Sequence, residues 1–212
     1  MHDFDYGFDW LETMDALPNC PWKRFADLWS YACGRLARTA PRRSKAVQRA
    51  EHSLAVARIV HDFAKDQMWP RWKRDTAIAA ALLHDVEKFS FSSWHEVAAE
   101  GFIMRNADEL EELLPEKCAV DFGKVADAVF LHRSKWKPWL TEMLEEDDLD
   151  AFDIAVILRA ADKLSHAGRE EKALKVFGDA LAVLEKSPQF GFMFFLHYRS
   201  VWCNFALERL PS

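Results

Sequence analysis

Long stretches of this chain contain neither glycine nor proline, and their apolar residues recur with helical spacing. Only 7 glycines and 8 prolines occur among the 212 residues. No segment shows the alternation of apolar and polar residues around a tight turn that marks a hairpin. The sequence therefore predicts an all-α fold, built as a single compact helical bundle. The expected helices cover residues 20–37, 44–66, 71–86, 94–114, 119–133, 150–166, 169–186 and 189–209.

Composition and charge narrow the class of protein further. Apolar residues make up 50% of the chain and the net charge is −6, so no overall positive field favours nucleic acid or an anionic membrane. Cys20, Cys33, Cys118 and Cys203 lie far apart without a C-x-x-C pair, which argues against a zinc ribbon or a disulfide framework. We expect a reduced, cytoplasmic protein without a signal peptide. No apolar stretch is long enough to span a bilayer.

Histidine and aspartate occupy interior positions of several predicted helices. His52 is followed on the same face of its helix by Val56 and Ile59, so it faces the interior. His84 and Asp85 end a run of alanine, isoleucine and leucine that is apolar nearly all round, where a charged carboxylate is costly unless it is paired. The further members of this set are His95, His132 and Asp162.

A metal centre explains why so many polar side chains would be buried together. Each unpaired buried charge costs on the order of several kcal/mol, and a shared cation removes that cost. Neutral imidazole and carboxylate are good ligands for divalent ions, and we expect one or two per chain, of Fe, Mn, Co, Ni or Zn. The other His-Asp dipeptide, His61-Asp62, is turned by about 900° from His52 at 100° per residue. It therefore points to the opposite side of that helix, where we expect a surface position.

In this order the residues resemble the HD-domain superfamily of metal-dependent phosphohydrolases. Residues 82–88 (LLHDVEK) are similar to the HD-x-x-K segment of that family, and residues 95–101 to its following histidine-led helix. Residues 161–165 (ADKLS) are similar to its closing aspartate segment, and the whole resemblance covers about residues 44–170. The chain departs from the pattern at Arg133, where many two-metal members carry a further histidine.

The resemblance implies a ligand set for each of two metal ions. The first ion would be held by His52, His84, Asp85 and Asp162. Asp85 would bridge to a second ion, held also by His95 and His132. The family includes one-metal and two-metal members, and the presence of His95 and His132 favours two.

The implied activity is hydrolysis of a phosphomonoester or phosphodiester of a nucleotide or small metabolite by metal-activated water. Asp85 and Lys88 would be the catalytic residues, and Lys88 and Arg133 would contact the substrate. The same ligand order also occurs in di-iron oxygenases of the HD fold that resemble myo-inositol oxygenase, which is the first alternative. A non-catalytic metal-binding sensor is the second alternative.

The resemblance leaves both ends of the chain unexplained. We expect an N-terminal helical extension over residues 1–43, an HD metal-binding core over 44–170, and C-terminal helices packed on that core over 171–212. The acidic run at 142–150 is typical of a solvated loop. The expected partner is a small-molecule phosphate ester or nucleotide, with no membrane and no large nucleic acid. A homo-oligomer is compatible with the sequence.

Overall fold

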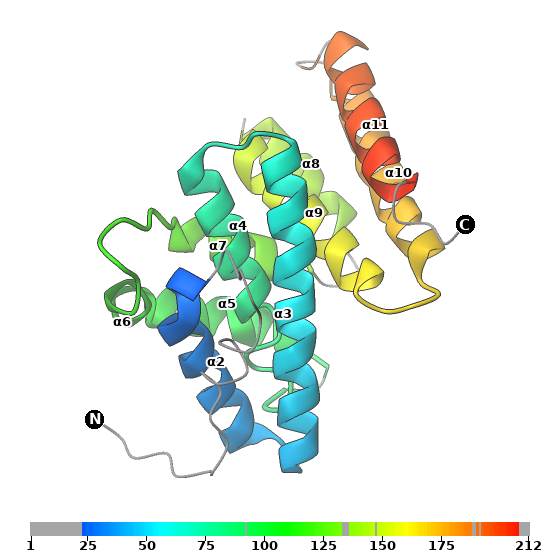
Figure 1. The fold of residues 1–212 in the computed structure, drawn as a ribbon. Helices are drawn as coiled ribbons and strands as arrows, with labels where there is room; N and C mark the ends of the chain where they lie inside the picture. The colour runs from blue at the N-terminus through cyan, green and yellow to red at the C-terminus, as the bar shows by residue number, and fades with distance from the viewer. Residues whose placement is uncertain are drawn as a thin grey trace.

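A computed structural model describes residues 23–91, 93–132, 136–146, 148–187, 190 and 192–207. Within these residues every regular element is a helix and no strand occurs (Figure 1). The prediction of an all-α fold is confirmed. No helix in this part of the chain is long and apolar enough to cross a membrane.

Of the helices described, α3 is the longest. A 3-10 turn, η1 (Lys23–Phe25), leads into α2 (Ala26–Thr39), α3 (Arg43–Asp66), α4 (Arg71–Leu83), α5 (His95–Arg105), α6 (Ala107–Glu112), α7 (Phe122–Phe130), α8 (Lys137–Glu145), α9 (Leu149–Leu164), α10 (Glu170–Glu185) and α11 (Phe192–Leu207). In Figure 1, α3 runs along the front of the bundle from bottom to top.

Helix α4 lies at the centre of the bundle. It packs against α2, α3, α7 and α9, and every side chain from Ala77 to Leu83 is buried. A helix that is apolar on all sides can be stable only when other helices surround it. Because α4 is held in this way, the turn that follows it, residues 84–90, begins in the interior.

Two charged residues of α4, Lys73 and Asp75, form ion pairs with other parts of the chain. The Nζ atom of Lys73 lies 2.5 Å from a carboxylate oxygen of Asp153 and 2.8 Å from one of Asp150, both on α9. Asp75 is fully buried and accepts a hydrogen bond from Arg24 in η1. Each buried charge on α4 therefore has a partner of opposite sign, as buried charges require.

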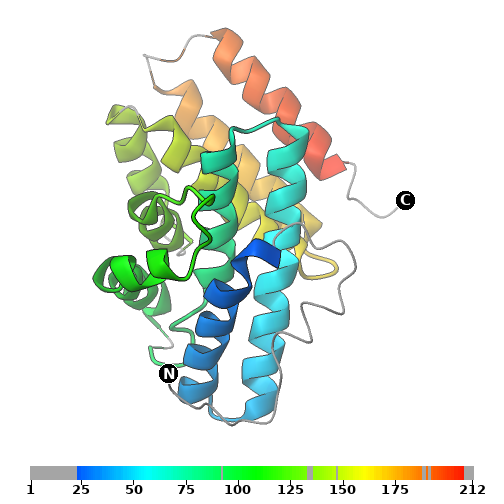
Figure 2. The ribbon, with the colours of Figure 1, turned by 60° about the vertical axis from the view of Figure 1, so that its left-hand side comes forward.

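On the N-terminal side, α2 lies alongside α3 (Figure 2). Phe25, Leu28 and Trp29 bury their side chains in the common core. Apolar residues at these spacings form one face of a helix, which explains why this segment packs on the bundle. Residues 1–22 of the expected N-terminal extension lie outside the described residues.

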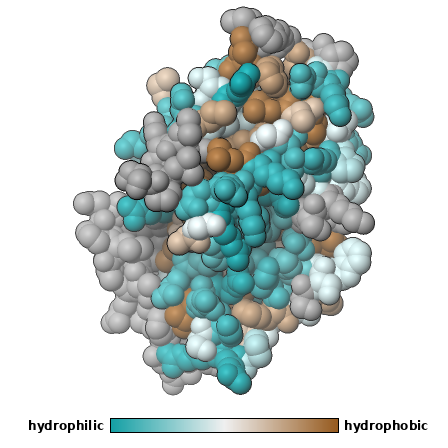
Figure 3. All heavy atoms as spheres, turned by 90° about the vertical axis from the view of Figure 1, so that its right-hand side faces the viewer, coloured by the Kyte–Doolittle hydropathy of each residue, from teal (hydrophilic) through white to brown (hydrophobic). Residues whose placement is uncertain are grey.

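On the C-terminal side, α10 packs against α8 and α9, and α11 packs against α10. The ring of Trp202 in α11 stacks on Phe177 in α10, with ring centres 5.5 Å apart and planes at 20°. Figure 1 shows these two helices side by side at one edge of the molecule. The face seen in Figure 3 is largely hydrophilic, with hydrophobic areas towards its upper end.

The predicted helix over 94–114 is two helices rather than one. The helix is interrupted at Asn106, between α5 and α6. The side-chain amide of Asn106 donates a hydrogen bond to the carbonyl of Phe102 at 2.7 Å. Asparagine competes in this way with the backbone ladder of a helix, which favours a break at this position.

The acidic run at 142–150 is also different from its prediction. Most of its described residues are helical: α8 continues through Glu145 and α9 begins at Leu149, with Glu146 and Asp148 between them. Leu140 and Leu144 are buried at helical spacing, so α8 has an apolar face that the charged residues obscure. Asp148 caps α9, because its carboxylate accepts a hydrogen bond from the backbone of Ala151 at 2.9 Å.

Candidate metal centre

The turn after α4 supplies two of the predicted ligands. His84 is fully buried, and its Nδ1 atom lies 2.7 Å from the carbonyl oxygen of Ala81, one turn back in α4. Since a carbonyl can only accept, Nδ1 carries the proton and Nε2 presents its lone pair. Asp85 follows directly, and its Oδ2 atom lies 3.6 Å from His84 Nε2.

His52 meets this turn from the neighbouring helix α3. Its Nε2 atom lies 3.3 Å from Nε2 of His84 and 3.9 Å from Oδ2 of Asp85. On the other side of the ring, Nδ1 lies 3.2 Å from the hydroxyl of Ser165. That hydroxyl donates its own proton to the carbonyl of Asp162, so it accepts from His52 Nδ1. The lone pair of His52 Nε2 therefore faces that of His84.

Helix α9 and the end of α7 complete the cluster. Asp162 lies in the last turn of α9, and its Oδ1 atom is 3.1 Å from His52 Nε2. His132 follows α7 by two residues, and its Nε2 atom is 3.7 Å from Oδ2 of Asp162. The rings of His84 and His132 meet edge to face at 5.2 Å. Residues far apart in the sequence thus converge on one buried point.

The remaining predicted residues, His95 and Lys88, lie against the other oxygen of Asp85. Nε2 of His95, the first residue of α5, is 3.4 Å from Asp85 Oδ1. Nζ of Lys88 lies 3.3 Å from that oxygen and 2.7 Å from His95 Nε2. His132, expected beside His95, is instead grouped with His84 and Asp162. The predicted substrate contact Arg133 lies outside the described residues.

The two carboxylates are ionised at neutral pH. Burial alone would raise the pKa of Asp85, but the neighbouring His84 and Lys88 outweigh it and hold that pKa well below its usual range. Burial also opposes ionisation of Asp162, and the nearby His52, His132 and Lys163 together bring the net pKa below the usual range. Both side chains therefore present charged oxygens to the centre of the cluster.

The buried imidazoles of His84 and His132 stay neutral, because burial lowers their pKa values. Burial lowers the pKa of His84 below its usual value, although the adjacent Asp85 partly opposes this. Burial lowers the pKa of His132 to about 3, against the opposing effect of Asp162. Neutral imidazole and ionised carboxylate are the forms that bind metal ions. At neutral pH Asp85, Asp162, His84 and His132 are thus already in their ligating protonation states.

The atoms that face the centre of the cluster show whether these residues fit a metal ion. The lone pairs of His52 Nε2 and His84 Nε2 face each other at 3.3 Å, with oxygens of Asp85 and Asp162 beside them. The assigned tautomers place no proton between these four acceptors. The geometry also brings together three overlapping sets whose ligand atoms all lie within 4.8 Å of one another. Their members are His52, His84 and Asp85; His84, His132 and Asp162; and His52, Asp162 and His166. The residues fit a cation at this point.

Three further residues contact the cluster, and sequence reasoning missed two of them, Arg49 and Ser165. Arg49 of α3 donates a hydrogen bond to Oδ2 of Asp85 at 3.0 Å. Ser165 holds the tautomer of His52, and His166 stacks on the His52 ring with centres 4.8 Å apart. Arg49 precedes His52 by three residues and so shares its helix face. That spacing is the signal that could have identified it.

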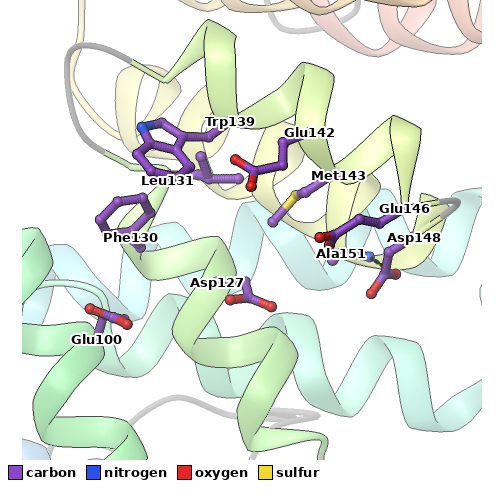
Figure 4. A pocket seen from close by; sticks show the side chains of 10 residues that line it. All are labelled: Glu100, Asp127, Phe130, Leu131, Trp139, Glu142, Met143, Glu146, Asp148 and Ala151. Atoms are coloured by element: carbon purple, nitrogen blue, oxygen red, sulfur yellow. Dashed lines mark hydrogen bonds between the residues drawn. The ribbon is translucent and has the colours of Figure 1, made fainter. Parts of the chain in front are cut away.

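A cavity of about 300 Å³, separate from the cluster, lies among α5, α7, α8 and the start of α9 (Figure 4). None of the predicted ligands lines it, and its walls carry many carboxylates. These belong to Glu100, Asp127, Glu142, Glu146 and Asp148. A phosphate group would be repelled there. His61 also lies apart from the cluster, where its Nδ1 atom is 3.3 Å from Asp62.

The helical fold and the buried histidine and aspartate cluster define a class of protein that can hold divalent metal ions. The family model for the HD domain matches residues 49–167, which is more than half of the chain. The protein belongs to the HD domain family, a superfamily of metal-dependent enzymes of hydrolase type. Neither a curated protein nor a solved structure gives a significant match.

Proposed function

We propose that this protein is a metal-dependent phosphohydrolase that cleaves a phosphomonoester or phosphodiester of a nucleotide or small metabolite. The observation that carries the proposal is the convergence of His52, His84, Asp85 and Asp162 with no proton between their acceptor atoms. Four such atoms in a buried site call for a cation. Membership of the HD family supports hydrolysis as the reaction type.

Both ligand sets follow from the resemblance, and the contacts among His52, His84, Asp85 and Asp162 support the first of them. The first ion would be held by His52, His84, Asp85 and Asp162. The second would be held by His95 and His132 together with Asp85. Bound divalent ions supply an acidified water molecule and offset the charge that develops on phosphoryl oxygens.

Two cations of the chain itself lie where a phosphate ester would approach. The side chains of Lys88 and Arg49 are 26% and 32% exposed, whereas the Asp85 side chain between them is 2% exposed. Both contact Asp85, so they border the cluster on its accessible side. Their ammonium and guanidinium groups would bind phosphoryl oxygens and orient the ester towards the buried ligands.

Lys88 has a second role in this proposal. Its Nζ atom is 2.7 Å from His95 Nε2 and 3.3 Å from Asp85 Oδ1. An ammonium held between these groups would donate a proton to the leaving oxygen as the ester bond breaks. The proton would neutralise the negative charge on that oxygen, and water would be the group that attacks phosphorus, so no serine or cysteine nucleophile is required.

The first test is phosphate release from a panel of mono- and diesters with manganese, iron or cobalt present. Loss of a group that only supports a metal ligand costs about 10- to 100-fold. Asp85→Asn removes a ligand itself, so we expect it to lower turnover by more than about 100-fold. The matched control is Asp62→Asn, in the other His-Asp dipeptide, which should keep wild-type turnover. Equal activity in Asp85→Asn and wild type would overturn the proposal.

The alternatives make different predictions in the same experiment. A di-iron oxygenase would release no phosphate from any ester and would give a mixed-valent di-iron signal by electron paramagnetic resonance. A metal-binding sensor would bind ions only when Asp85 is present, and it would hydrolyse neither monoesters nor diesters. Metal analysis of the same samples separates these outcomes from a protein that binds no metal.

A further inference from the structure

A basic cleft opens where α8, α9 and α10 meet, with a volume of about 650 Å³. This size lies within the range of about 300–1,000 Å³ that is usual for small-molecule sites. None of the predicted metal ligands lines the cleft. Its charged side chains are those of Lys137, Arg159, Lys163, Lys172, Lys175 and Asp179. Five are cations and one is an anion.

The single carboxylate does not balance this charge. Asp179 lies 2.7 Å from Lys137 at the edge of the cleft, which leaves a net positive charge on the other side chains. Lys172 and Lys175 are exposed on α10 three residues apart, so they share a helix face. Like charges at this spacing repel each other and destabilise a helix. A bound anion would remove that repulsion.

The cleft is joined to the metal centre by two of its own cations. Lys163 lines the cleft and also donates a hydrogen bond to Oδ2 of Asp162, a predicted ligand. Arg159, one turn earlier on α9, donates to the backbone carbonyl of His132, another predicted ligand. Its guanidinium lies 4.9 Å from the ring centre of the buried Trp136, which fixes its position. The positive charge therefore extends from the predicted ligands outward to α10.

We propose that this cleft binds a second phosphate group of the substrate, linked to the one that lies at the metal centre. The inference rests on the proposed phosphohydrolase function and names its substrate class as molecules with two or more linked phosphates. Lys163 and Arg159 hold the part of the chain of phosphates nearest the cluster. Lys172 and Lys175 hold the part that extends towards solvent.

A short polyanion fits the cleft better than a nucleic acid strand does. The neighbouring cavity shares helix α8 with the basic cleft and carries carboxylates from Glu142 and Glu146 (Figure 4). An extended phosphate backbone that left the cleft across α8 would meet this negative charge. The formal net charge of −6 adds to the same effect. The positive charge is thus limited to the length of a few linked phosphates.

The test compares binding of inorganic tripolyphosphate and orthophosphate to the full, metal-loaded chain by calorimetry, with the same excess of magnesium in every sample. The variant is Lys172→Glu with Lys175→Glu, and the matched control is Lys65→Glu with Lys117→Glu. Both pairs change the net charge equally at exposed positions. Because hydrogen bonds to charged groups are strong, we expect the cleft variant to lower the ratio of tripolyphosphate to orthophosphate affinity by at least about tenfold. The control should keep the wild-type ratio.

Three further binding measurements test the role of charge and the kind of ligand. Lys172→Arg with Lys175→Arg should keep the wild-type ratio, since it preserves the charge. Adenosine 5′-triphosphate in place of tripolyphosphate distinguishes a nucleotide from an inorganic chain of phosphates. A short single-stranded RNA that binds through Lys172 and Lys175 when tripolyphosphate does not would overturn the proposal. So would an unchanged affinity ratio in the cleft variant.

Binding in these arms needs no turnover, so the two proposals can fail separately. An affinity ratio that the cleft variant leaves unchanged, with normal activity on a monoester, would leave the phosphohydrolase intact and refute the cleft. Lysine-dependent tripolyphosphate binding without phosphate release from any ester would support the cleft as a polyphosphate site and refute hydrolysis. Circular dichroism of each variant verifies that the helices are retained.

Discussion

His84 and His52 are each held in one tautomer by a neighbour that belongs to the backbone or to a small side chain. The carbonyl of Ala81 accepts the Nδ1 proton of His84, and the hydroxyl of Ser165 accepts that of His52. Both rings consequently direct a lone pair at the same point. Partners of this kind fix the orientation of metal-binding imidazoles and raise their affinity.

The buried imidazoles predict how the metal-free protein responds to acid. His132 has a pKa of about 3 in the folded chain against 6.5 when exposed, and that of His84 is also lowered by burial. Between pH 6.5 and 3 the unfolded chain therefore binds protons that the folded chain does not. We expect the free energy of unfolding to fall through this window by at most roughly 1.4 kcal/mol per pH unit for His132. Denaturant titrations of wild type and His132→Gln should show a shallower slope in the variant, and identical slopes would contradict the assignment.

At the residue scale, the candidate ligands could be named from the sequence, but one cation that contacts them was not. Six candidate ligands could be named because each begins, follows or lies within an apolar helical run, and the structure gathers these side chains around Asp85 and Asp162. Arg49 is not among them, because a basic run at the start of a helix is usually solvated, although its spacing from His52 places it on the same helix face. Only the packing of α3 against the turn after α4 brings its guanidinium to Asp85.

At the scale of helices, a buried ion pair holds α4 to α9. Lys73 is nearly buried and lies between Asp150 and Asp153. Lys73→Met would leave Asp153 buried without its cation, and breaking such a pair costs about 3–5 kcal/mol. Thermal or denaturant unfolding should report a loss of this size. Lys65→Met, at an exposed position of α3, should change stability by less than about 0.5 kcal/mol, and an equal effect of both would refute this role.

Helix α8, which the sequence analysis did not predict, shows why a short helix with many charged residues is hard to predict. The segment of α8 is rich in acidic residues, and its apolar face consists of few side chains, among them Leu140 and Leu144. Such a short pattern is weak beside a run of like charges. Packing against α9 and α10 stabilises α8 in the folded chain, and that packing cannot be read from the local sequence.

At the scale of the whole molecule, metal binding should be linked to folding. The candidate ligands lie in α3, α5 and α9 and in the turns that follow α4 and α7, and the contact between His52 and Asp162 joins residues 110 positions apart. An ion that binds only the folded chain stabilises it by about 2.7 kcal/mol at 100 times its Kd. Manganese should therefore raise the thermal unfolding midpoint of wild type by several degrees, and a chelator should reverse the change. Asp85→Asn should show little shift, and a shift equal to that of wild type would refute the ligand assignment.

The basic cleft takes Lys172 and Lys175 from α10, which begins at Glu170, beyond the residues 49–167 that match the family. The ligand cluster, by contrast, lies within the matched region. Under our proposal, the chemistry belongs to the inherited core and the choice of substrate to an appended helix. Changes in α10 could then redirect the enzyme to a new compound during evolution while the reaction itself stays intact, and the same exchange offers a route for engineering its selectivity.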